Sequence, residues 1–160
     1  MIHIGLDVGV TGAIAAIDTV CRDVYDLPIT SSGKSKWVQG ADLAHLLRDC
    51  KGMQACRVTV EATHAMPGNG SRTSHSQGMT LGSVLAVLDV LGYPYELVQP
   101  AVWKRDMGLL GGKTDAERKK AALARARREF PEAPLEREKD HNRAEALLIA
   151  LWAQNQYRGP

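Results

Sequence analysis

The chain has 160 residues, which is enough for one compact domain with a hydrophobic core and too few for two ordinary ones. Hydrophobic residues make up 44% of the sequence and charged residues 24%, which excludes an intrinsically disordered chain. The net charge of +2 is close to neutral, so any electrostatic argument about partners depends on where the charged side chains lie.

The first part of the chain predicts four strands and one helix. A strand, tight turn and strand come first, with Gly9 and Gly12 in the turn and Gly9 relieving crowding beside Asp7. Ser, Thr, Gly and Lys dominate Pro28–Lys36, which predicts a loop. The expected strands are Ile2–Val8, Ala13–Ile17, Arg22–Leu27 and Arg57–Glu61, and the expected amphipathic helix is Ala41–Cys50.

The second part of the chain predicts four helices and one further strand. Glycine and proline in Ala62–Thr73 predict an exposed loop. Thr114 is a suitable N-cap for a basic helix that ends near Glu129. The remaining expected helices are Ser74–Leu91, Pro100–Lys104 and His141–Gln154, and the expected strand is Tyr95–Val98.

This order of elements indicates an α/β protein. Three hairpin-linked strands followed by β-α-β units predict a mixed five-stranded sheet, with an antiparallel meander beside parallel strands and helices on both faces. No internal repeat or linker divides the sequence, so residues 1–160 are expected to form a single domain.

The sequence also predicts where the protein resides. The three cysteines lack CxxC spacing, which argues against a disulfide framework and favours a reducing compartment. The N-terminus does not have the pattern of a signal peptide, and no apolar stretch reaches the roughly 18 residues that a membrane span needs. We expect a cytoplasmic protein with no membrane partner, associated with the nucleoid or, if phage-encoded, in the host cytoplasm.

Two carboxylates stand at predicted strand ends. Asp7 ends the first strand and Glu61 ends another. Ligands bind outside the strand ends of open α/β sheets, so these two acids are candidates for one shared site. The alternative is that each is a strand-end cap or a turn former.

A third acid strengthens this hypothesis. Glu145 lies in the apolar last helix, with His141 one turn before it and Asn142 three residues before it. A carboxylate beside a buried helix face is costly unless it is paired or binds a cation, and a salt bridge to Arg143 or a neighbouring lysine is the alternative. Three carboxylates and an imidazole suit Mg²⁺ or Mn²⁺. Two such ions about 4 Å apart activate water and stabilise the leaving 3′ oxygen in phosphodiester cleavage.

Four motifs resemble those of RuvC-type Holliday junction resolvases, in particular the shorter RuvC-like proteins of phages and prophages. They are Ile4–Ala13, Val60–Glu61 with His64–Gly68, Pro100–Lys104 and Asp140–Leu147, and they cover nearly the whole chain in the family's order. The resemblance implies a ribonuclease H-like fold, a homodimer, and paired nicks in four-way DNA junctions with Mg²⁺ or Mn²⁺. Asp7, Glu61 and Glu145 match three of the family's acids.

The fourth family position departs from the pattern. Three residues before the last acid, relatives usually carry Asp or His, whereas this chain has Asn142. Asp140 and His141 are immediate neighbours that would substitute, and we favour His141 because one helical turn separates it from Glu145. The fourth metal ligand therefore remains open among these three residues.

Basic and hydroxyl side chains near these motifs are candidate DNA contacts. The loop Gly68–His75 offers backbone N–H groups, Arg72 and Ser74, but no aromatic wedge, with Met66 as the only large apolar candidate. Lys104 is a candidate to stabilise charge at the scissile phosphate, or else a structural partner of Trp103. The remaining expected contacts are Lys113, Arg118, Lys119, Lys120 and Arg143.

Other hypotheses stay open. Small residues in the helix Ser74–Leu91 (Gly78, Gly82, Ser83) predict either a dimer contact or packing onto the sheet. The turn Asp7–Gly12 also resembles the phosphate-binding turn of sugar kinases and actin, although 160 residues supply only half of such an ATPase. Because Asn142 stands where relatives carry a metal ligand, one alternative is a non-catalytic DNA-binding protein of the same fold. Another alternative to a strict junction resolvase is a general flap or branched-DNA nuclease.

Overall fold

The computed structural model describes residues 1–20, 22–62 and 70–157, apart from the side chain of Arg72. A five-stranded sheet has the order β3-β2-β1-β6-β7. β1 pairs antiparallel with β2 and β2 with β3, whereas β1–β6 and β6–β7 are parallel. The predicted mixed sheet with an antiparallel meander is therefore confirmed. Its strands are β1 (Ile2–Asp7), β2 (Ala13–Ile17), β3 (Arg22–Asp26), β6 (Cys56–Glu61) and β7 (Tyr95–Val98).

A second, two-stranded sheet lies where the sequence predicts a loop. β4 (Ile29–Ser32) and β5 (Ser35–Val38) form an antiparallel hairpin whose turn contains Gly33 at φ +59°. The prediction for Pro28–Lys36 was wrong because a polar hairpin has few apolar residues to mark its strands. Val38 is its buried anchor, and β5 contacts the helix α2.

The described residues also form five α-helices and a short 3₁₀ helix, which are α1 (Gly40–Lys51), α2 (Ser71–Leu91), α3 (Pro100–Asp106), α4 (Asp115–Glu129), η1 (Glu138–Asp140) and α5 (His141–Tyr157). Thr114 caps α4 as predicted, because its hydroxyl accepts from the N–H of Glu117 and the Glu117 carboxylate accepts from the N–H of Thr114. α2 begins at Ser71, so the predicted loop Ala62–Thr73 extends too far. Most of that loop, residues 63–69, lies outside the described residues.

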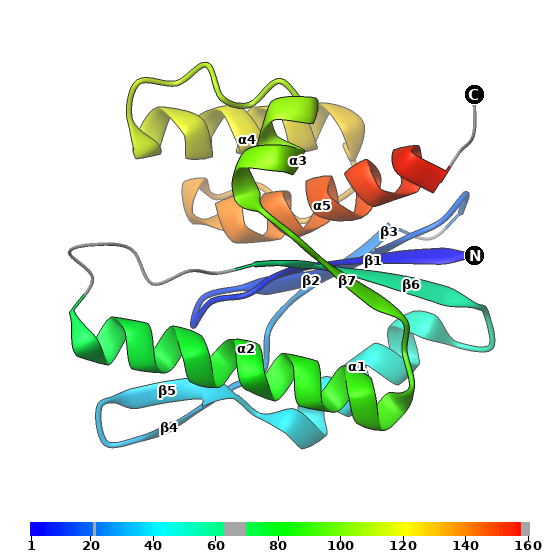
Figure 1. The fold of residues 1–160 in the computed structure, drawn as a ribbon. Helices are drawn as coiled ribbons and strands as arrows, with labels where there is room; N and C mark the ends of the chain where they lie inside the picture. The colour runs from blue at the N-terminus through cyan, green and yellow to red at the C-terminus, as the bar shows by residue number, and fades with distance from the viewer. Residues whose placement is uncertain (21, 63–69, 158–160) are drawn as a thin grey trace.

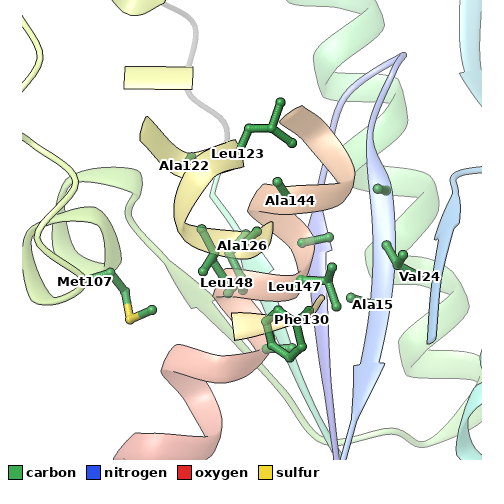
Figure 2. Close-up of a cluster of buried hydrophobic side chains, with 14 of the residues drawn as sticks. Ala15, Val24, Met107, Ala122, Leu123, Ala126, Phe130, Ala144, Leu147 and Leu148 are labelled. Atoms are coloured by element: carbon green, nitrogen blue, oxygen red, sulfur yellow. The ribbon is translucent and has the colours of Figure 1, made fainter. Parts of the chain in front are cut away.

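Helices cover both faces of the large sheet, as expected. In Figure 1, α3, α4 and α5 lie on one face, and α1, α2 and the β4–β5 hairpin lie on the other. Each face has its own hydrophobic core. Figure 2 shows the first, in which Leu147 and Leu148 of α5 pack among residues of the sheet, Ala126 of α4 and Phe130, which directly follows α4.

Helix α5 lies between the sheet and α4, and all residues from Ala144 to Ala150 are buried. A helix that is apolar on all sides is expected in such a position. Glu145 is the charged residue within this run and is only 7% exposed. None of the described helices combines the length and apolar character that a bilayer span requires. Cys50 and Cys56 are buried cysteines in the thiol form, and Cys21 lies outside the described residues.

Candidate metal centre

Three carboxylates converge at one edge of the large sheet. Asp7 ends β1, Glu61 ends the parallel neighbour β6, and Glu145 lies near the start of α5. One oxygen from each carboxylate lies within 4.8 Å of the other two. These three residues form what we call the acidic cluster. The sequence pattern predicts this convergence, because parallel neighbours end at the same edge of a sheet.

Close backbone packing places α5 against β1. A Cβ atom added to Gly5 would lie 2.3 Å from the carbonyl oxygen of Ala146 and 2.5 Å from the amide nitrogen of Ala150. Only glycine permits this approach, and Glu145 is the residue directly before Ala146. The absence of a side chain at Gly5 therefore helps to bring the third acid to the first.

The turn after Asp7 also depends on a glycine, but on a different one from that predicted. A Cβ atom at Gly12 would lie 2.1 Å from the carbonyl oxygen of Asp7, whereas the same atom at Gly9 would have nothing closer than 4.0 Å. Gly12 donates its N–H to the carbonyl oxygen of Gly9 at 2.9 Å. Gly12, rather than Gly9, relieves the crowding beside Asp7.

Burial and nearby negative charge raise the pKa of two of these acids, Asp7 and Glu61. Loss of hydration, followed by the charges of Glu61 and Glu145, raises the pKa of Asp7 well above its ordinary value. Burial also raises the pKa of Glu61, and Lys104 and a hydrogen bond from Trp103 oppose that rise. The acids are thus held in a site that favours either protons or another positive charge.

Helix α3 supplies two partners for these acids. The Trp103 indole Nε1 donates to Oε1 of Glu61 at 2.8 Å, and Trp103 is fully buried. Lys104 Nζ lies 2.9 Å from Oε2 of Glu145 and 5.1 Å from the centre of the Trp103 ring. Burial lowers the pKa of Lys104, but attraction to Glu145 and Glu61 outweighs it, so the pKa is raised and the ammonium stays charged.

This set of side chains fits a divalent cation. Three carboxylates face one ammonium in the described part of the site, which leaves an excess of negative charge. Hard ions such as Mg²⁺ and Mn²⁺ take carboxylate oxygens and complete their coordination with water or phosphate. The observed cluster therefore has the donor chemistry that the sequence predicts for a metal site.

Asp140 and His141 lie outside the acidic cluster. The Asp140 carboxylate accepts hydrogen bonds from the Arg137 backbone N–H, Nε and Nη2 at 2.8, 2.9 and 2.6 Å, and Arg137 lowers its pKa. His141 Nδ1 lies 3.4 Å from the carbonyl oxygen of Glu138. Both residues line a hollow of about 400 Å³ between the β1–β2 turn and the start of α5. Asp140 therefore serves the structure of this segment, and it does not join the three acids.

Asn142 connects α5 to the turn that follows Asp7. Its side-chain Nδ2 donates to the carbonyl oxygen of Thr11 at 2.5 Å and to Thr11 Oγ1 at 2.8 Å. These bonds hold the first turn of α5 against the β1–β2 turn. At the family's fourth position the chain thus has an amide engaged with the protein backbone.

Among the candidate DNA contacts at α4, Lys119 interacts with the acidic cluster. Lys119 pairs with Asp115 at 3.1 Å and acts electrostatically on Asp7. Arg118 Nη1 donates to the carbonyl oxygen of Gly112 at 3.2 Å. Two further candidates are exposed, Lys113 before the helix and Lys120 within it.

The other candidate DNA contacts have different surroundings. Arg143 donates to both carboxylate oxygens of Asp26 at 2.7 and 2.8 Å and to the carbonyl oxygen of Pro134. Ser74 is half-buried in the first turn of α2, and the side chain of Arg72 lies outside the described residues. Arg143 therefore already has a structural role, in which it connects α5 to β3.

Two features of the site were not predicted. The hydrogen bond from Trp103 to Glu61 depends on how α3 packs against β6, which no local pattern reports. The salt bridge from Arg137 to Asp140 has a three-residue spacing that would have signalled an ion pair near the start of the last helix.

Comparisons with known proteins agree with the motifs. No protein-family model matches the chain. Over 96 residues, 59% of the chain, it is 38% identical to the chloroplastic Holliday junction resolvase MOC1 of Chlamydomonas reinhardtii, and it spans about 10% of the length of that relative.

Solved structures show the same fold. The chain matches T. thermophilus RuvC in complex with Holliday junction substrate at a TM-score of 0.65 and 19% identity, over 99% of this chain and 95% of that one. A second structure, described as Thermus thermophilus RuvC, matches at a TM-score of 0.57 and 17% identity, over 98% of this chain and 97% of that one. The chain therefore has the ribonuclease H-like fold of RuvC, and its predicted resemblance to RuvC-type Holliday junction resolvases is confirmed.

Proposed function

We propose that this protein is a structure-specific endonuclease that resolves four-way DNA junctions by paired, metal-dependent phosphodiester hydrolysis. The observation that carries the proposal is the acidic cluster, in which Asp7, Glu61 and Glu145 come from three separate elements to lie within 4.8 Å of one another. Its position at the sheet edge, on a fold shared with RuvC, supports the same conclusion.

The three acids would hold Mg²⁺ or Mn²⁺, and we propose two ions. Bound there, such ions activate water and stabilise the leaving 3′ oxygen. Trp103 fixes one carboxylate oxygen of Glu61 and so orients the other. Lys104 neutralises part of the charge of Glu145, and its ammonium would stabilise charge at a scissile phosphate bound beside the acidic cluster.

His141 is our proposal for the fourth ligand. Asp140 is engaged with Arg137 and Asn142 with Thr11, whereas the polar contact of His141 involves only Nδ1, which lies at a long 3.4 Å from the carbonyl oxygen of Glu138. Among the described residues, His141 is therefore the member of the trio whose side chain is least committed.

Branched DNA is the proposed partner, and a homodimer is the proposed assembly. Two strands are cut in a paired reaction, which a two-fold dimer performs with two sites. Gly78, Gly82 and Ala86 are exposed at four-residue spacing on α2, and a Cβ atom at either glycine would have no neighbour within 4 Å. Packing onto the sheet therefore does not explain these glycines, and we propose that this face of α2 contacts a second copy.

The test uses a labelled synthetic four-way junction, a flap and a linear duplex, each with Mg²⁺ or Mn²⁺. We expect symmetric nicks on the junction alone. Nicks on all branched substrates would indicate a general branched-DNA nuclease. Binding without nicks under both metals would favour the non-catalytic DNA-binding hypothesis and contradict the proposal.

The assembly is tested separately by sedimentation. Replacing Ala86 with arginine places a charge in the proposed contact, so we expect the wild type to sediment as a dimer and the variant as a monomer. Equal sedimentation of the two proteins would contradict the proposed use of α2.

A further inference from the structure

The hairpin that the sequence did not predict forms one wall of a basic groove. A shallow hollow of about 180 Å³ is lined by Val10 of the β1–β2 turn, Lys34 and Lys36 of the hairpin, and Thr73 and Ser76 of α2. We call these five residues the hairpin groove. It lies apart from the acidic cluster, because none of the three acids lines it.

The groove lies close to the proposed cleavage site. Val10 is three residues after Asp7, so their Cα atoms are separated by at most about 11 Å. Figure 1 shows the β1–β2 turn, the tip of the β4–β5 hairpin and the start of α2 at the same edge of the molecule. At a rise of about 3.4 Å along the duplex axis for each nucleotide of one strand, this distance corresponds to about three nucleotides.

The chemistry of the groove suits a phosphodiester backbone. It offers two ammonium groups and two hydroxyls, and no acidic residue lines it. Lys34 and Lys36 are exposed, and neither forms an ion pair with any residue that the structure describes. Lys119 of α4 differs, because Asp115 already neutralises it. The hairpin lysines are thus more available than Lys119 to bind an anion.

We propose that the hairpin groove binds a backbone phosphate of the DNA within about three nucleotides of the nick. The proposal rests on the function proposed above and adds a DNA subsite to it. Lys34 and Lys36 would neutralise the phosphate, and the hydroxyls of Thr73 and Ser76 would donate hydrogen bonds to its oxygens. The alkyl stems of the lysines and Val10 leave an apolar surface for the sugar.

The first test measures how salt affects junction binding in EDTA, where no DNA is cut. Each phosphate that a cation neutralises adds about 0.9 to the slope of log affinity against log salt. We therefore expect K34Q/K36Q, which leaves the one proposed phosphate without a cation, to lower this slope by about 1, and each single variant to lower it by less. The matched control R48Q/K51Q removes two charges from the last turn of α1 and should retain the wild-type slope.

The second test locates the phosphate. Neutral methylphosphonate linkages replace single phosphates of the junction, one position at a time. We expect one position within about three nucleotides of the nick to weaken binding of the wild type and of R48Q/K51Q by about tenfold or more, and to leave K34Q/K36Q nearly unaffected.

The outcomes separate the two proposals. A slope for K34Q/K36Q equal to that of the control, or no phosphate coupled to the two lysines, would overturn the hairpin groove even if the wild type nicks junctions. A wild type that binds no branched DNA would overturn the groove and the proposed function together. The single variants keep the test informative if the double variant fails to fold.

Discussion

Carboxylates in two regions of this molecule have opposite surroundings. In the acidic cluster, Asp7, Glu61 and Glu145 lie beside one another. Burial and repulsion from the other two acids raise the pKa of Asp7. At the start of α5 and on β3, Asp140 and Asp26 each accept hydrogen bonds from an arginine that lowers their pKa. Asp7, Glu61, Asp26 and Asp140, four acids with shifted pKa values, all lie near the β1–β2 turn or the start of α5, so proximity to the site does not separate them. What separates them is that an arginine already pairs with Asp26 and another with Asp140.

The largest expected effect is the loss of nicking in the acidic cluster. D7N and E61Q each replace a negatively charged carboxylate that would bind the metal with a neutral amide. We expect the nicking rate to fall about 10³-fold or more, which corresponds to about 4 kcal/mol of transition-state stabilisation. Junction binding should change little. Single-turnover cleavage and binding in EDTA measure the two properties. Wild-type nicking by either variant would contradict the metal site.

The second prediction concerns the fourth ligand. We expect H141A to lower nicking about 10–100-fold at limiting Mn²⁺, with partial recovery at high Mn²⁺, because a lost ligand weakens metal binding. N142A should show no such recovery, because its amide holds the β1–β2 turn rather than a metal. Metal titrations of the nicking rate compare the two. Recovery of N142A but not of H141A would reverse the assignment.

The third prediction concerns stability. Asp140 is 2% exposed and accepts three hydrogen bonds from Arg137, so D140N should lower the free energy of unfolding by about 2 kcal/mol. The Asp26 carboxylate is 63% exposed, so D26N should cost well under 1 kcal/mol. Urea unfolding measures both, and nicking by the folded D140N protein should stay close to wild type. A loss of nicking as large as that of D7N would place Asp140 in the metal site.

The smallest expected effect is the pH dependence of the metal-free protein. A raised pKa for Asp7 and Glu61 means that the folded state binds protons more tightly than the unfolded state. The contribution of these two groups to the free energy of unfolding is therefore fully present below about pH 4, the pKa of the unfolded state. It declines as the pH rises through the higher pKa values of the folded state. Asp26 and Asp140 act in the opposite direction, because their contribution is lost as the pH falls through their lowered folded values.

This difference predicts that D7N is more stable than the wild type in EDTA at neutral pH, by on the order of 1 kcal/mol. Excess Mg²⁺ or Mn²⁺ should stabilise the wild type more than D7N. Urea unfolding between pH 4 and 8, with and without metal, measures both effects. A metal-free D7N protein less stable than the wild type would show that Asp7 has other partners that compensate its charge.

The sequence predicts the main sheet well, because hydrophobic alternation and β-branched residues mark its strands. It fails at β4 and β5, where polar residues form a hairpin that only tertiary contact with α2 reveals. The three acids were predicted from their places at strand ends and in an apolar helix. Asp140 stayed a candidate fourth ligand, although its three-residue spacing from Arg137 already indicates the ion pair that the structure shows. The contact from Trp103 to Glu61 depends on packing between distant elements.

Gly5 has a consequence for when the site exists during folding. The first acid lies in the first strand and the third in the last helix, and their meeting depends on a backbone contact that any side chain at position 5 would block. A partly folded chain in which α5 has not docked therefore holds two acids without the third. Under the proposed function, such intermediates would not cleave DNA, so the order of assembly restricts nuclease activity to the completed domain.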